Sequence, residues 1–168
     1  MDIVEDNNEI LTLASKRGYM DIVKIMLNKE INNYNEAMKA AAQNGHIETL
    51  KFLLENGAND FNGAMEEAAY GGHIDIVMLM LSKGANSYNS SMVWAARSGN
   101  IDIIRLMLDR GANDYNRTMA IAVDEWSQEI VQLMLECGAD NYDEFLPWVK
   151  CKDIKQLLTA AKEGKVKI

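Results

Sequence analysis

The chain has little proline, cysteine and histidine, and it lacks any long apolar run. Its 168 residues include one proline and two cysteines. Two cysteines do not make a disulfide framework, so we expect Cys137 and Cys151 to be free thiols in a reducing compartment. No stretch approaches the roughly 18 uninterrupted apolar residues of a membrane span, and the acidic N-terminus lacks the pattern of a signal peptide. We therefore expect an intracellular, cytoplasmic protein with no membrane partner.

Positive charge is also scarce. Seventeen basic side chains against twenty-five acidic ones give a formal net charge of −8. Nucleic-acid binders need clustered lysine or arginine to displace counterions from phosphates, and no such run occurs in this sequence. The composition argues against nucleic acid as a partner.

The sequence does contain a strong internal repeat. An aromatic residue recurs every 27 positions, at Tyr34, Phe61, Tyr88, Tyr115 and Tyr142. Asparagine or aspartate follows each of them directly, and Met38, Met65, Met92, Met119 and Leu146 stand four positions after them. Glycines keep the same register, at 18, 45, 72 and 99 and again at 57, 84, 111 and 138. Several independent series with one period indicate a repeat architecture.

Each repeat is predicted to form a helix, a turn and a second helix. Asn35 and its equivalents are predicted N-caps of the first helix, whose Met, Ala and Ala positions share one face. The glycines suit helix ends that need a left-handed residue. In the third repeat the second helix is expected over about 74–83, with Ile76, Val77, Met80 and Leu81 facing inward. Helices this short are not stable alone, so the repeats must stack on one another.

Two segments carry a family resemblance. Residues 68–77 read Ala-Ala-Tyr-Gly-Gly-His-Ile-Asp-Ile-Val, and residues 81–86 read Leu-Ser-Lys-Gly-Ala-Asn. They resemble the ankyrin-repeat consensus, and the resemblance covers about residues 7–160. The repeats are shorter than the usual 33 residues of ankyrins. The missing six lie before the first helix, where ankyrins project β-hairpin fingers. The Tyr-Asn signature and Met-rich helices also look similar to the ankyrin arrays of giant DNA viruses of amoebae.

We accordingly predict an all-α, ankyrin-like helical solenoid of about six helix-turn-helix units without extended β-hairpin fingers. One domain over residues 1–168 would contain the units 7–33, 34–60, 61–87, 88–114, 115–141 and 142–168, with degenerate terminal caps. The fifth unit departs at its central turn, where Asp-Glu-Trp-Ser at 124–127 replaces the usual x-x-Gly-His. The sixth has lost about three residues and contains Pro147.

No catalytic, cofactor or metal site emerges from the sequence. His46 and His73 hold the same repeat position, too far apart for a shared zinc ion, and we expect local hydrogen bonds in their turns. Neither cysteine has an evident base beside it. The recurring acids Glu48, Asp75, Asp102 and Glu129 suit the starts of second helices, where the helix dipole favours negative charge. Most methionines are expected in the core, and the chain is not expected to be an enzyme.

A binding surface should lie where the repeats differ, because positions shared by every repeat are explained by stacking. The variable positions fall mostly on one side of the first helix, which in ankyrins lines the concave groove. The candidate partner-binding residues are Tyr70, Trp94, Arg97, Glu67, Gln43 and Trp126. Tryptophan, tyrosine and arginine are the types that dominate interface hot spots. The alternative roles are covering a neighbouring helix for Trp94 and packing the end cap for Trp126.

The sequence thus predicts a protein–protein interaction module that uses the concave face, with no cofactor. The viral resemblance implies a host protein as the partner, met in the host cytoplasm. The alternative is a structural array that self-associates through a poorly capped end into dimers or filaments, whereas the interaction module is compatible with a monomer.

Overall fold

The structure, a computed structural model, describes residues 3–29 and 31–165, and its regular structure there is entirely helical. The chain divides into two compact units, Met1–Ser87 and Tyr88–Ile168. This division falls between two predicted repeats, 61–87 and 88–114. The single domain predicted over 1–168 stays a prediction.

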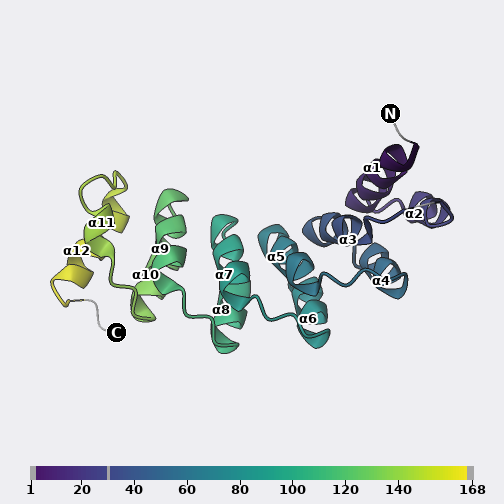
Figure 1. The fold of residues 1–168 in the computed structure, drawn as a ribbon. Helices are drawn as coiled ribbons and strands as arrows, with labels where there is room; N and C mark the ends of the chain where they lie inside the picture. Colours follow the sequence, from purple (N-terminus) through teal and green to yellow (C-terminus); the bar gives the residue numbers. More distant parts are fainter. Residues whose placement is uncertain (1–2, 30, 166–168) are drawn as a thin grey trace. The chain divides into compact units, whose positions relative to one another are not determined.

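Each unit is a series of helix pairs (Figure 1). The first contains α1 (Ile3–Lys16), α2 (Met20–Met26), α3 (Tyr34–Gln43), α4 (Ile47–Glu55), α5 (Phe61–Gly71) and α6 (Ile74–Ser82). The second contains α7 (Tyr88–Arg97), α8 (Ile101–Asp109), α9 (Tyr115–Asp124), α10 (Gln128–Glu136), α11 (Tyr142–Phe145) and α12 (Lys152–Lys162). Odd-numbered helices are the first helices of the repeats and even-numbered ones the second. The predicted all-helical repeat fold is confirmed, and no strand forms within the described ranges.

The predicted apolar stripes form the core. In unit 1 the first helices stack, α3 packing against both α1 and α5, and in unit 2 α9 packs against α7. The methionines four positions after each aromatic are fully buried: Met38, Met65, Met92 and Met119. In α6, Ile76, Val77 and Met80 are buried as expected, whereas Leu81 is only half-buried. Small alanines beside the methionines leave room for this close stacking.

The turns between paired helices are built on left-handed glycines. Gly72 caps α5 with φ of 80° and ψ of 19°, and Gly45 and Gly99 have φ of 74° and 77°. Glycine adopts this region without steric cost because it has no Cβ. The histidine that follows each turn does not form the local hydrogen bond that we expected. The His73 Nε2 lies 3.1 Å from the Gln43 carbonyl oxygen, and the His46 Nε2 lies 3.0 Å from the Lys16 carbonyl oxygen. Each histidine therefore ties its repeat to the preceding one.

The repeated asparagine is not an N-cap, and this prediction was wrong. The first helix begins at the aromatic residue, so Asn35 is already inside α3 and Asn33 is its N-cap. The Asn35 Oδ1 instead accepts hydrogen bonds from two backbone amides of the turn that follows α4, those of Asn59 at 2.7 Å and Asp60 at 3.0 Å. Its Nδ2 donates to the Asn59 Oδ1 at 3.2 Å.

We call this arrangement the asparagine clamp, and it recurs through both units. The side-chain oxygens of Asn62, Asn89 and Asn116 accept from the corresponding pairs of turn amides, at 2.7–3.4 Å. Asn8 accepts from the amide of Asn32 at 3.2 Å. Without β-hairpin fingers, the backbone amides of these short turns have no hairpin in the neighbouring repeat to pair with. The clamp satisfies these amides instead, which explains why the asparagine recurs with the shortened repeat.

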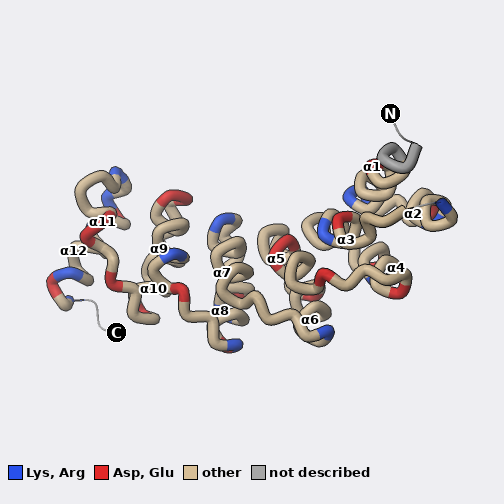
Figure 2. Tube along the Cα trace, in the orientation of Figure 1, with Lys and Arg blue, Asp and Glu red and all other residues tan. Residues whose placement is uncertain are grey.

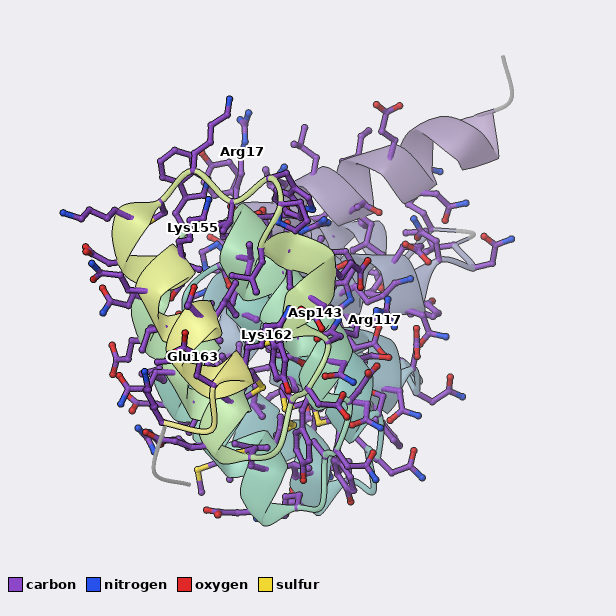
Figure 3. The ribbon with its side chains drawn as sticks, turned by 90° about the vertical axis from the view of Figure 1, so that its left-hand side faces the viewer. Arg17, Arg117, Asp143, Lys155, Lys162 and Glu163 are labelled. Carbon is purple, nitrogen blue, oxygen red and sulfur yellow. The ribbon has the colours of Figure 1, made fainter. Side chains whose placement is uncertain are left out.

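The last repeat departs from this pattern. α11 has four residues and ends at Phe145, and its C-cap Leu146, which precedes Pro147, keeps right-handed helical angles with φ of −50° and ψ of −38°. Asp143 takes the clamp position, and its Oδ1 pairs with the Lys162 Nζ of α12 at 2.6 Å (Figure 3). Hydrogen bonding to Asp143 raises the pKa of Lys162. An ion pair at the surface thus links α12 to α11.

Candidate functional site

In unit 1 the variable side chains of the first helices line a shallow polar groove. Its volume is about 270 Å³, and its lining residues are Thr12, Lys16, Glu36, Lys39, Ala40, Gln43 and Glu67. The Gln43 Nε2 donates to the Glu67 Oε2 at 2.7 Å, which joins α3 to α5. The Lys39 Nζ lies 2.6 Å from the Glu36 Oε1, and this hydrogen bond is the main cause that raises the pKa of Lys39. The charged groups of the groove largely pair with one another.

Tyr70 lies one residue before the end of α5, with 39% of its surface exposed. It belongs to unit 1, as do Gln43 and Glu67. The other predicted residues, Trp94, Arg97 and Trp126, belong to unit 2.

In unit 2 Trp94 and Arg97 form one cluster on α7. The Arg97 guanidinium carbon lies 5.5 Å from the centre of the Trp94 ring, within the range of a cation–π interaction. Trp94 keeps 37% of its surface exposed. Helical spacing of three residues places both side chains on one face near the end of α7. A planar cation stacked on an exposed indole is a surface that can be buried by a partner.

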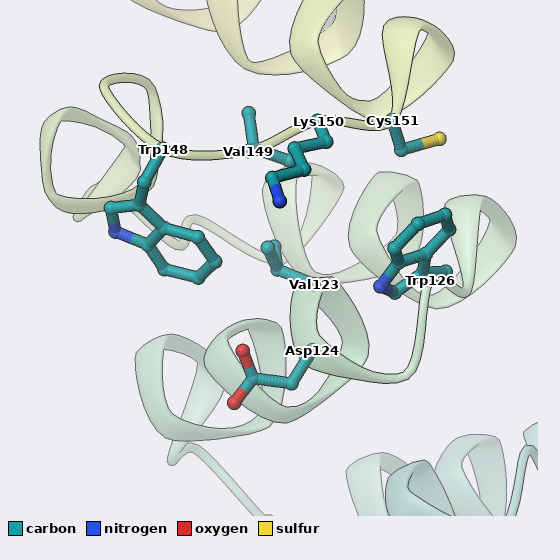
Figure 4. A pocket seen from close by; sticks show the side chains of 7 residues that line it. All are labelled: Val123, Asp124, Trp126, Trp148, Val149, Lys150 and Cys151. Carbon is teal, nitrogen blue, oxygen red and sulfur yellow. The ribbon is translucent and has the colours of Figure 1, made fainter.

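A second aromatic cluster surrounds a hollow of about 220 Å³ in the same unit. Figure 4 shows Trp126 and Trp148 on opposite sides of the hollow, with Val123 between them and Lys150 reaching in from the loop before α12. The remaining lining residues are Asp124, Val149 and Cys151. Trp126 is 65% exposed and Trp148 is 50% exposed, while the Trp148 ring meets Phe145 edge-on with 5.7 Å between the ring centres.

Trp126 holds an unfavourable backbone conformation. Its φ is 60°, and it is the one non-glycine residue with positive φ within the described parts of the chain. Glycine fills the same turn position in the four preceding repeats. A bulky residue in this region costs on the order of 1–3 kcal/mol, and such strain tends to occur at functional sites.

Charge alternates along this side of unit 2. Figure 2 shows a basic end on α7 and an acidic end on α9. The basic end is Arg97, and the acidic end is Asp124 followed by Glu125. Lys150 lies in the α11–α12 connection, and Lys152 is the first residue of α12. Tryptophans thus lie among charges of both signs.

The family model of ankyrin repeats in three copies matches residues 1–64 and 65–144. These matches cover most of the chain. The chain belongs to the ankyrin-repeat family. None of the curated proteins matches it. Ankyrin repeats generally mediate binding between proteins and are typically not enzymes.

The described residues contain no group of three or more histidine, cysteine or acidic side chains that could hold a metal ion. Burial raises the pKa of the Cys137 thiol, which disfavours the reactive thiolate. None of the described helices has the length and apolar content needed to cross a bilayer. The intracellular location and the viral resemblance stay predictions.

Sequence reasoning missed one tryptophan of this ankyrin-repeat protein. Trp148 was not among the predicted binding residues, yet it lines the hollow with Trp126. It stands six positions after Tyr142, as Trp94 stands six after Tyr88 and Glu67 six after Phe61. This shared repeat position was the available signal.

Replacement of Trp126 by glycine should stabilise the protein. Glycine removes the strain at positive φ, and the exposed indole loses little packing, so we expect the free energy of unfolding to rise by about 0.5–1 kcal/mol. Urea unfolding followed by circular dichroism measures it. The opposite change Gly99→Ala, at the same repeat position with φ of 77°, should destabilise the protein by a similar amount. A loss of stability in Trp126→Gly would show that the ring mainly packs the end cap.

Proposed function

We propose that this protein is an interaction module whose partner binds the side of unit 2 on which all three of its tryptophans are exposed. The observation that carries the proposal is their placement. Trp94 lies on the first helix α7, Trp126 just after the first helix α9, and Trp148 just after the first helix α11. Large aromatic side chains are normally buried, and exposed ones provide much apolar area at low entropic cost to a partner.

The arrangement also suits specific recognition. Arg97, Asp124 and Lys150 place charges of both signs beside the tryptophans, so a partner must match their order as well as cover the indoles. Hot spots of this kind combine central aromatic or arginine anchors with a polar surround.

The surface belongs to the first helices, the side that lines the concave groove in ankyrin arrays. We extend the proposal to Tyr70, Glu67 and Gln43 on the first helices of unit 1 as further contacts. The similarity to arrays of giant DNA viruses extends it again, with a host protein as the partner in the cytoplasm of the infected cell.

The test compares the protein with its Trp94→Ala/Arg97→Ala variant. Proteins captured from amoeba lysate on the immobilised wild type are identified by mass spectrometry, and the most enriched one is purified for calorimetric titration. We expect the double variant to bind this purified protein about 10- to 100-fold more weakly, with unchanged helicity.

A matched control is Met78→Ala on α6, because Met78 is also exposed but lies on a second helix. Its affinity should equal that of the wild type. The proposed surface would be contradicted if the Trp94→Ala/Arg97→Ala variant bound as tightly as the wild type. It would also be contradicted if Met78→Ala lost as much affinity as the double variant.

A further inference from the structure

The hollow beside Trp126 has an apolar lining and two aromatic walls. Val123 and Val149 supply the lining, and both are buried. The indoles of Trp126 and Trp148 stand on opposite sides of them (Figure 4). The hollow's volume of about 220 Å³ lies below the roughly 300–1,000 Å³ of sites that hold whole small ligands. Its size therefore suits one large side chain rather than a complete cofactor.

The Trp148 wall is fixed in place by contacts within the chain. The Trp148 Nε1 donates to the Glu144 carbonyl oxygen at 2.9 Å, and its ring meets Phe145 edge-on. The polar group of this indole is thus already satisfied, so the ring offers the hollow apolar surface. A wall that needs no ordering when an occupant arrives lowers the entropic cost of binding.

The Trp126 wall is held in an unfavourable backbone conformation. Trp126 has φ of 60° at a turn position that glycine fills in the four preceding repeats. Because its side chain is 65% exposed, packing within the chain offsets little of this strain. An occupant of the hollow would bury the indole and supply the packing that the free protein lacks.

One positive charge points into the hollow. In Figure 4 the Lys150 side chain reaches in with its Nζ between the two indoles, whereas the Asp124 carboxylate points toward the edge of the hollow. Lys150 is exposed, and it belongs to none of the ion pairs formed among the residues that the structure describes. An unpaired ammonium group beside apolar walls attracts a carboxylate and repels a cation. The charge of the hollow therefore favours an acidic occupant.

We infer that the hollow receives a large apolar side chain of the partner protein, flanked in the partner's sequence by an acidic residue that pairs with Lys150. The inference rests on the proposed function, and it names the part of that partner that is recognised here. The two indoles and Val123 cover the apolar side chain, and the Lys150 Nζ binds the carboxylate. Apolar burial supplies most of the affinity, and the lysine decides which sequences are accepted.

Peptide titration of the isotope-labelled whole chain, followed by NMR of its three indole N–H signals, tests the inference. The probes are acetylated, amidated tripeptides in which phenylalanine stands between two aspartates, two asparagines or two lysines, so that either chain direction is covered. The Trp126 and Trp148 signals should shift, and that of Trp94, which does not line the hollow, should not.

We expect the aspartate peptide to bind about fivefold more tightly than the asparagine peptide, and the lysine peptide to bind more weakly than either. The net charge of −8 on the whole chain attracts the lysine peptide, so a preference for aspartate reports the local charge of the hollow. Alanine in place of the phenylalanine should weaken binding of the aspartate peptide at least about tenfold, because the apolar anchor is lost.

Two variants separate the roles of the lysine and of the aromatic wall. Lys150→Gln should abolish the preference, so that the aspartate and asparagine peptides bind equally. Lys155→Gln is the matched control, because it gives the same net charge from an exposed lysine that does not line the hollow, and it should keep the preference. Trp126→Gly should weaken binding of the aspartate peptide at least about tenfold, with unchanged helicity by circular dichroism.

The inference would be overturned by the absence of shifts at Trp126 and Trp148, or by tighter binding of the lysine peptide. A preference for aspartate that survives Lys150→Gln would overturn it as well. These results concern the hollow alone. The proposed function is tested separately, by binding of the captured protein to the Trp94→Ala/Arg97→Ala variant, so the failure of one can be told from the failure of the other.

Discussion

Alanine in place of Gly71 is expected to lower the free energy of unfolding by about 2–4 kcal/mol. Gly71 is the last residue of α5, and it lies against the backbone of Gln43 at the end of α3. A Cβ added there would overlap the backbone carbonyl oxygen of Gln43 and crowd the His73 ring. The same carbonyl oxygen lies 3.1 Å from the His73 Nε2, so the clash also disturbs the bond between these repeats.

The clash at Gly71 outweighs the helix propensity that alanine would add. Alanine is favoured over glycine in a helix by about 0.5–1 kcal/mol, and less at its last residue. A clash with backbone cannot be relieved by rotating a side chain, so α3 and α5 must move apart. Urea unfolding monitored by circular dichroism measures the outcome. Asn44→Ala is the control, because Asn44 holds the same repeat position as the C-cap of α3 and is exposed. It should change stability by only about 0.5 kcal/mol. A Gly71→Ala protein as stable as the wild type would refute the close approach.

Loss of one asparagine clamp should cost about 1–3 kcal/mol. The Asn89 Oδ1 accepts from the amides of Asn113 at 2.7 Å and Asp114 at 3.1 Å, and Asn89→Ala removes both acceptor interactions at once. Hydrogen exchange of these two amides should accelerate more than that of amides in α7, which gives a readout specific to the clamp.

The matched control for the clamp is Asn113→Ala. It removes only the 3.2 Å bond from the Asn89 Nδ2 to the Asn113 Oδ1 and keeps both bonds to backbone amides. We expect its cost to be a few tenths of a kcal/mol, because both groups of that bond are exposed. Equal losses in the two variants would mean that the side-chain bond, rather than the amide bonds, carries the stabilisation.

Much of the fold followed from the period of the repeat. The positions of Met65, Ala68 and Ala69 identified a buried stripe, and Gly72 identified a left-handed helix end. These features depend on local propensity and on which side of a helix is apolar, and both can be read within a single repeat. The clamp could not, because the two ends of each bond lie 24 or 25 residues apart. Within a single repeat, an asparagine beside an aromatic residue fits a helix cap as well as it fits the clamp. Only the distance between stacked repeats distinguishes the two.

The candidate site was likewise predictable from the sequence only in part. Trp94 and Arg97 were predictable as a pair because three residues separate them on one helix. Trp126 and Trp148 share a hollow only because the turn after α9 and the loop before α12 come together in the folded unit.

The amino-acid sequence by itself determined the helix pairs, their apolar faces, the glycine turns and the membership of a repeat fold, because each depends on a pattern that recurs every 27 residues. Only the tertiary structure decided that the repeated asparagines hold the next turn and that Trp126 takes a left-handed conformation opposite Trp148. These depend on distances between repeats, which arise when the helices stack.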